Sequence, residues 1–69
     1  MIVFQSRRDE FDALISMHYY DTVAKRVIAR ADFKANAQQF YVSSKANNWK
    51  GDWHTHEIDA RAALDALIA

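Results

Sequence analysis

The chain has 69 residues, of which 51% are hydrophobic and 26% charged, and it contains no cysteine. This composition excludes an intrinsically disordered protein, since such proteins have low hydrophobicity and high net charge. The lack of cysteine excludes disulfide bonds and a zinc site with thiolate ligands. No apolar run approaches the roughly 18 residues of a membrane span. We therefore expect one small soluble domain over residues 1–69, located in the cytoplasm and without a membrane partner.

Charge is unevenly distributed along the chain, although nine basic and nine acidic residues give a formal net charge of zero. Residues 1–21 and 51–69 each carry more acidic than basic side chains. Residues 22–50 carry six basic side chains and one acidic side chain. The sequence therefore predicts a domain with acidic ends and a basic middle.

The first expected element is a helix over residues 7–19. The run from Ser6 to Asp9 resembles a capping box, which marks the start of a helix. Four side chains then repeat at the spacing of one helical face: Phe11, Leu14, Ile15 and His18. The apolar residues 1–4 before this helix offer an additional edge strand to a sheet.

The pattern of residues 21–35 fits either a helix or a strand. In a helix, Val23, Val27 and Ala31 would share one side. In a strand, the side chains of residues 26–33 would alternate between the two faces of the sheet. We favour a strand over residues 26–33. Residues 38–44 form a clear strand by their aromatic and β-branched centre, and a lone hairpin needs a further partner for stability. After an asparagine-rich turn, residues 49–55 are expected as a third strand, bent or bulged at Gly51.

Residues 60–68 have the clearest helical pattern in the chain. Their apolar side chains fall on one face of a helix: Ala60, Ala63, Leu64, Leu67 and Ile68. Thr55 and Asp59 are the candidate caps at the start of this helix. The expected fold class is therefore α+β, with a helix, a three-stranded antiparallel sheet and a C-terminal helix packed on it, in the order α-β-β-β-α with an extra N-terminal edge strand.

This order, and the alanine-rich run from Asp59 to Ile68, is similar to the end of a double-stranded-RNA-binding domain, whose last helix follows a glycine-bearing strand. An alanine-rich helix also has a plain packing explanation, since small side chains let a helix lie close on a sheet. That family opens its last helix with lysines that hold phosphate, whereas this chain has Glu57, Ile58 and Asp59 there. We therefore expect the family's fold without its grip on RNA.

Large amphipathic aromatic side chains outnumber what so small a core can absorb, so some of them must be partly exposed. Tyrosine and tryptophan are enriched at binding hot spots, because a rigid ring supplies contact area while its polar tip stays satisfied. The residues expected to contact a protein partner are Tyr41, Trp49, Lys50 and Trp53. The alternative for Trp49 and Trp53 is that they simply cover the core from a loop.

The favoured function is a small non-enzymatic binding protein of the inhibitor, adaptor or regulator type. No nucleophile elbow or phosphate-cradling glycine loop is present, so we expect no enzyme activity and no cofactor. Short chains without cysteine or an enzyme motif are common among the accessory and inhibitory proteins of mobile elements. This general frequency is the only basis for suggesting such an origin, because no residue of this chain indicates it. A homo-oligomer paired through residues 1–4 is a further hypothesis.

Nucleic-acid binding is the alternative function, because aromatic residues are interleaved with the basic residues of segment 22–50. The residues expected to meet phosphates are Lys25, Arg26, Arg30, Lys34, Lys45 and Lys50. The zero net charge weakens this hypothesis, since phosphate contacts dominate nucleic-acid affinity. A metal site is less favoured still: His54 and His56 would share one face of a strand, but no third nitrogen or sulfur ligand stands near them.

Overall fold

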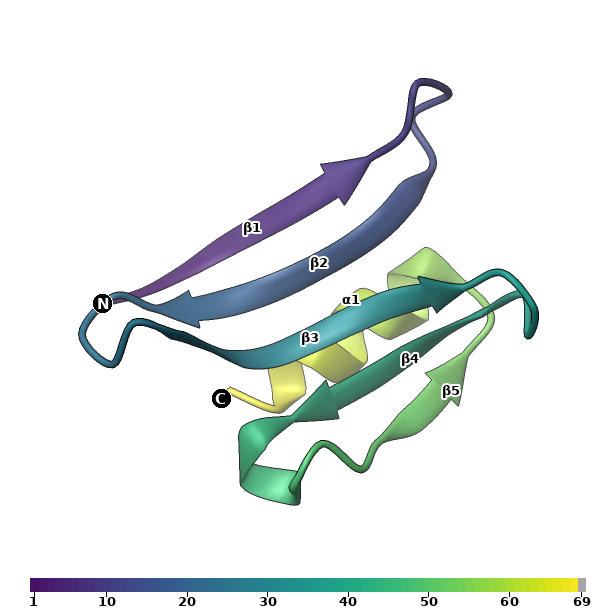
Figure 1. The fold of residues 1–69 in the computed structure, drawn as a ribbon. Coiled ribbons are helices and arrows are strands. Elements are labelled where there is room, and N and C mark those ends of the chain that lie inside the picture. Colours follow the sequence, from purple (N-terminus) through teal and green to yellow (C-terminus); the bar gives the residue numbers. More distant parts are fainter. Residues whose placement is uncertain (69) are drawn as a thin grey trace.

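The computed structural model describes residues 1–68 as a five-stranded antiparallel sheet with one helix against one of its faces (Figure 1). The strands are β1 (Ile2–Arg8), β2 (Leu14–Asp21), β3 (Arg26–Lys34), β4 (Gln39–Ser44) and β5 (Asp52–His54), and they lie in the sheet in chain order. A short 3-10 turn, η1 (Lys45–Asn47), follows β4, and the helix α1 (Glu57–Ala66) follows β5. Among these residues, no helix is long and apolar enough to cross a membrane.

The expected helix over residues 7–19 is wrong, because these residues form the end of β1, a hairpin loop and most of β2. The Asp9 carboxylate accepts hydrogen bonds from the backbone N–H groups of Phe11 (2.8 Å) and Ala13 (3.0 Å), which closes a turn. Asp12 then takes a left-handed φ of 64°, which a right-handed helix does not allow. The element order is therefore β-β-β-β-β-α, and the α-β-β-β-α order of a double-stranded-RNA-binding domain is not found.

The other expected elements correspond more closely to the structure. The strands over residues 26–33 and 38–44 are confirmed as β3 and β4, and the C-terminal helix is confirmed as α1. Residues 49–55 contain only the short β5, and the edge strand expected over residues 1–4 extends through Arg8. The N-cap of α1 is His56, so neither Thr55 nor Asp59 takes that position.

The core lies between α1 and the face of the sheet that it covers. Its buried apolar side chains are Leu14, Met17, Ala29, Ala31, Phe40, Val42, Ala60 and Leu64. Ala29 and Ala31 of β3 and Ala60 of α1 are completely buried, so small side chains on both elements let the helix lie close to the sheet. Strand side chains alternate between faces, so the intervening residues of β3 point to the opposite, helix-free face.

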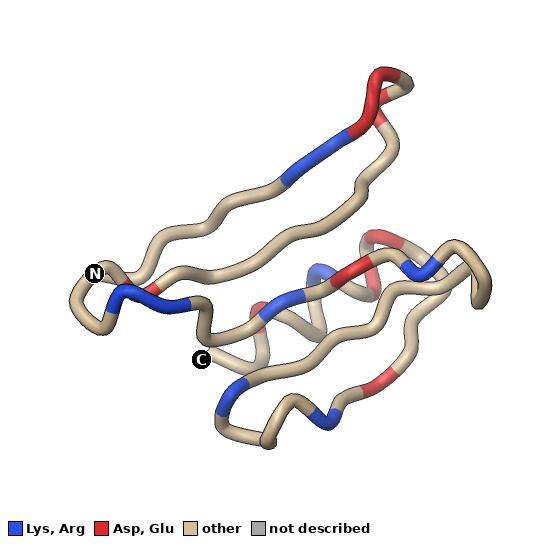
Figure 2. The backbone as a smooth tube through the Cα atoms, viewed as in Figure 1, with Lys and Arg blue, Asp and Glu red and all other residues tan. Residues whose placement is uncertain are grey.

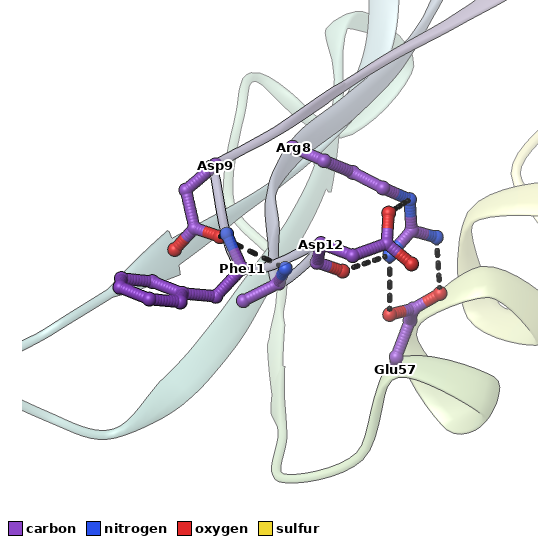
Figure 3. A network of polar contacts seen from close by, with 6 residues as sticks. Arg8, Asp9, Phe11, Asp12 and Glu57 are labelled. Atoms are coloured by element: carbon purple, nitrogen blue, oxygen red, sulfur yellow. Dashed lines mark hydrogen bonds and ion pairs between the residues drawn. The ribbon is translucent and has the colours of Figure 1, made fainter.

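Polar contacts connect β1 and β2 to the helix. The Arg8 guanidinium donates to the two carboxylate oxygens of Glu57 at 2.8 and 3.3 Å and to the carbonyl oxygen of Asp12 at 3.0 Å (Figure 3). These hydrogen bonds from Arg8 lower the pKa of Glu57. The Tyr19 hydroxyl donates to Asp65 at 2.6 Å, which raises the pKa of Tyr19 and lowers that of Asp65. The first hairpin is thereby held against both ends of α1.

Candidate functional site

Side chains suited to recognition gather on the helix-free face of the sheet, where β3, β4 and β5 run side by side. The alternation that sends Ala29 and Ala31 into the core sends Arg30 and Asp32 to this opposite face. An open hollow of about 340 Å³, here called the aromatic hollow, is lined by Arg30, Asp32, Lys34, Tyr41, Ser43, Trp49 and Trp53. Its lining thus combines three aromatic rings with side chains of both charges.

Two of the rings are held in place by neighbours in the sheet. Tyr41 and Trp53 are opposite residues of β4 and β5, and their ring centroids lie 5.0 Å apart with an interplanar angle of 58°. The Tyr41 hydroxyl accepts a hydrogen bond from the backbone N–H of Gly51 at 2.8 Å. Trp53 nevertheless remains 48% exposed. The hollow therefore presents an accessible tryptophan on a rigid support.

Trp49 reaches the hollow from a loop with an unusual backbone. Asn48 and Trp49 both have left-handed φ values, 55° and 61°, and this conformation is uncommon for a bulky residue such as tryptophan. The N–H of Trp49 donates to the carbonyl oxygen of Ser44 at 2.8 Å, which returns the chain to the end of β4. The Arg30 guanidinium carbon lies 5.2 Å from the centre of the Trp49 ring. The strained loop therefore positions an aromatic ring beside a cation.

Gly51 allows this loop to approach β4 closely. A Cβ atom at this position would overlap the carbonyl oxygen of Val42 and lie 3.0 Å from the Cα atom of Ser43. Both contacts are with backbone atoms, which cannot rotate away from a side chain. The need for glycine here therefore comes from lack of space next to β4.

Two cations and one carboxylate line the hollow. The Arg30 Nε atom lies 3.3 Å from Asp32 Oδ2, while Lys34 adds a second cation at the end of β3. Figure 2 shows the wider layout: acidic residues mark the β1–β2 hairpin and the start of α1, and basic residues mark both ends of β3 and the loop after β4. The hollow itself therefore offers both charges to a ligand.

The structure brings together three of the four residues predicted to contact a protein partner. Tyr41, Trp49 and Trp53 line the aromatic hollow. Lys50 lies apart from them and lines a groove of about 230 Å³ on the other side of the sheet, where His54 and the helix residue Ala63 also contribute. The four predicted residues therefore do not form one site.

The six basic residues predicted to meet phosphates are more widely dispersed. Arg30 and Lys34 line the hollow, but Lys50 lines the groove next to α1. Lys25 and Arg26 lie where the β2–β3 turn enters β3, and Lys45 begins η1. The six basic residues are therefore spread along β3 and over the turns next to it, and they do not form one compact patch.

The two histidines of the metal hypothesis take different structural positions. His54 ends β5 and lines the groove next to α1, whereas His56 is the N-cap of the helix. Within residues 1–68, no group of three or more His, Cys, Asp or Glu side chains is placed to hold a metal ion. Trp53, the middle residue of β5, faces away from His54 and lines the aromatic hollow.

Sequence reasoning did not place Asp32 and Ser43 in a site. The available signal was the two-residue alternation of β3 and β4, which puts Asp32 with Arg30 and Ser43 with Tyr41. The chain matches no family model, no curated protein and no solved structure in comparisons with known proteins. The fold and the hollow define a small α+β domain with one face of its sheet covered by a helix and the other face carrying aromatic and charged side chains.

Proposed function

We propose that this chain is a small non-enzymatic binding protein that holds a protein partner on its aromatic hollow. Trp53 carries the proposal, because it is 48% exposed and yet backed by Tyr41, which is itself fixed through Gly51. A ring that is already ordered loses little conformational entropy when a partner covers it. Tryptophan, tyrosine and arginine are also the residue types that dominate binding hot spots, and all three line this hollow.

The charges of the hollow favour a protein over a nucleic acid. Arg30 already forms an ion pair with Asp32 at 3.3 Å and a cation–π contact with the Trp49 ring. A phosphate chain crossing the hollow would bring negative charge to the Asp32 carboxylate. A protein partner can place a donor near Asp32 and a carboxylate near Lys34, which satisfies both charges.

The test compares partner capture by the wild-type chain and by Trp53→Ala. Each protein is immobilised and exposed to a lysate of the organism that produces it, and the retained proteins are quantified by mass spectrometry. Truncation of a hot-spot tryptophan costs about 2 kcal/mol or more, so we expect retention of the specific partner to fall about thirtyfold. Phe11→Ala is the control, because Phe11 is 82% exposed but lies in the first hairpin, outside the hollow. Equal retention by wild type and Trp53→Ala would contradict the proposal.

Single-stranded nucleic acid is a second candidate, since exposed rings and cations on a sheet face suit base stacking and phosphate contact. Lys34, which lines the hollow together with Trp53, favours it. Titration with a single-stranded oligothymidylate should then quench tryptophan fluorescence, less so as salt is raised. Lys34→Ala should reduce the slope of log affinity against log salt by about one. Absence of quenching at low salt would exclude this candidate.

A further inference from the structure

The outer side of β1 is an open edge of the sheet (Figure 1). The N–H of Thr22 donates to the carbonyl oxygen of Met1 at 2.9 Å, so these two residues form a hydrogen-bonded pair at the start of the β1–β2 ladder. Hydrogen-bonded and non-hydrogen-bonded pairs alternate in an antiparallel ladder. The odd-numbered residues of β1 therefore bond to β2. Ile2, Phe4 and Ser6 direct their backbone N–H and C=O groups away from the sheet.

The two edges of the sheet differ in their protection. β5 is three residues long and contains Asp52, and a short, charged edge strand pairs poorly with other strands. Between Ile2 and Ser6, β1 contains no charged residue and no proline, and its register with β2 is regular. The charges and the register shift come only at Arg7 and Arg8. β1 therefore lacks the features that usually prevent an edge strand from pairing.

We propose that β1 pairs with β1 of a second copy of this chain, antiparallel about a two-fold axis at Phe4. Phe4 then lies opposite the second copy's Phe4, and Ile2 lies opposite the second copy's Ser6. Each of these pairs uses the outward backbone groups and forms two hydrogen bonds. The pairing also covers part of Ile2, an apolar side chain that is 48% exposed in the single chain.

A second copy suits this edge because the free groups are symmetric about Phe4 and β1 itself carries no charged side chain between Ile2 and Ser6. The Arg61 guanidinium, 3.8 Å from the centre of the Phe4 ring, is paired with the Asp65 carboxylate at 3.0 Å, so the cation nearest the axis has its counter-charge.

Asp21, opposite Ile2 on β2, lies one strand behind this edge, and its carboxylate already accepts hydrogen bonds from the N–H groups of Val23 and Ala24. Self-pairing therefore rests on the regular, uncharged backbone edge from Ile2 to Ser6, which is complementary to itself about a two-fold axis.

The two-fold axis of such a pair runs perpendicular to the sheet. The two five-stranded sheets become continuous, with both helices on one side and both aromatic hollows on the other. The pairing does not depend on the proposed function, because no residue of the hollow takes part in it. Its consequence for that function is a partner surface presented twice on one face.

Sedimentation equilibrium at micromolar concentration tests the pairing. The wild type should show twice the chain mass of 8.0 kDa. The double variant Ile2→Lys with Ser6→Lys places lysines opposite lysines and should weaken the dimer about tenfold or more. The matched variant Ile2→Lys with Ser6→Glu changes the same positions but places opposite charges together, and it should remain a dimer. A monomeric wild type, or equal weakening by both variants, would overturn the proposal.

Disulfide trapping tests the register, since the chain contains no cysteine of its own. Residues 3 and 5 of the two copies lie opposite each other as a non-hydrogen-bonded pair, with Cα atoms about 4.5 Å apart, which a disulfide can span. A mixture of Val3→Cys and Gln5→Cys should therefore cross-link under mild oxidation, and each variant alone should not. Cross-linking of Gln5→Cys alone would overturn the axis at Phe4.

Discussion

Replacement of Gly51 by alanine should destabilise the domain by forcing β5 away from β4. The added Cβ would overlap the carbonyl oxygen of Val42 and crowd the Cα atom of Ser43, and neither backbone atom can rotate aside. Relief requires a shift of the loop. That shift would break the hydrogen bond from the Gly51 N–H to the Tyr41 hydroxyl, which is 2.8 Å long. It would also disturb the contact between Tyr41 and Trp53.

The expected cost of Gly51→Ala combines two effects. Overpacking costs about 1–3 kcal/mol, and loss of a hydrogen bond costs about 0.5–1.5 kcal/mol. We therefore expect a loss of about 2–4 kcal/mol in the free energy of unfolding. A chain of 69 residues has about 3–10 kcal/mol in total, so the loss is a large fraction. The melting temperature should fall by about 8 °C or more.

Differential scanning calorimetry measures this fall, and near-ultraviolet circular dichroism reports the packing of the rings in the hollow. Tyr41→Phe separates the two effects, because it removes the hydroxyl without adding a Cβ and should cost no more than about 1.5 kcal/mol. Asn47→Ala is a control in the same loop, where an exposed substitution should change stability by less than about 0.5 kcal/mol. A melting temperature for Gly51→Ala equal to that of the Asn47→Ala control would refute the crowding argument.

Three further predictions concern stability. Leu64 is completely buried, so Leu64→Ala should lower the free energy of unfolding by about 2–5 kcal/mol in urea titrations, and an unchanged midpoint would contradict its place in the core. Lys25 has a left-handed φ of 58°, a conformation that costs a residue other than glycine about 1–2 kcal/mol. Lys25→Gly should therefore raise the melting temperature. A lower melting temperature would argue against relief of backbone strain. Arg8 lowers the pKa of Glu57 in the folded state. The Glu57 carboxylate therefore stabilises the fold at pH values above its unfolded pKa of about 4.3. This stabilisation is lost as the pH falls through the lower pKa that Glu57 has in the folded protein. Glu57→Gln should flatten the dependence of the urea midpoint on pH below about 5, and an identical dependence in both proteins would exclude this contribution.

Local patterns were sufficient where they matched the final environment of the chain. Ala29 and Ala31 alternate with Arg30 and Asp32, and this two-residue period correctly indicates a strand with one buried face. The four-residue spacing of Ala60 and Leu64 likewise predicts the helical face that enters the core. These elements are recognisable because their periodicity states which side is buried.

The first hairpin shows why such patterns also fail. Phe11, Leu14 and Ile15 have helical spacing, but Phe11 lies 82% exposed in a turn while Leu14 is buried in the sheet. Asp9 is compatible with a helix start and with a hairpin turn, because a carboxylate that can cap the backbone N–H groups of a helix can also accept the N–H groups of a turn. Pairing of β1 with β2 and of β2 with β3 selects the strand, and that choice depends on residues far along the chain.

By itself, the sequence determined a small core, strands around residues 26–44, a C-terminal helix and an excess of aromatic side chains that one core cannot hide. Only the tertiary structure decided which of these side chains meet. Arg30 reaches Trp49 because β3 pairs with β4, and Trp53 packs against Tyr41 because β5 pairs with β4. Strand pairing joins residues that are distant in sequence, so a surface built across three strands leaves no local pattern by which it could be recognised.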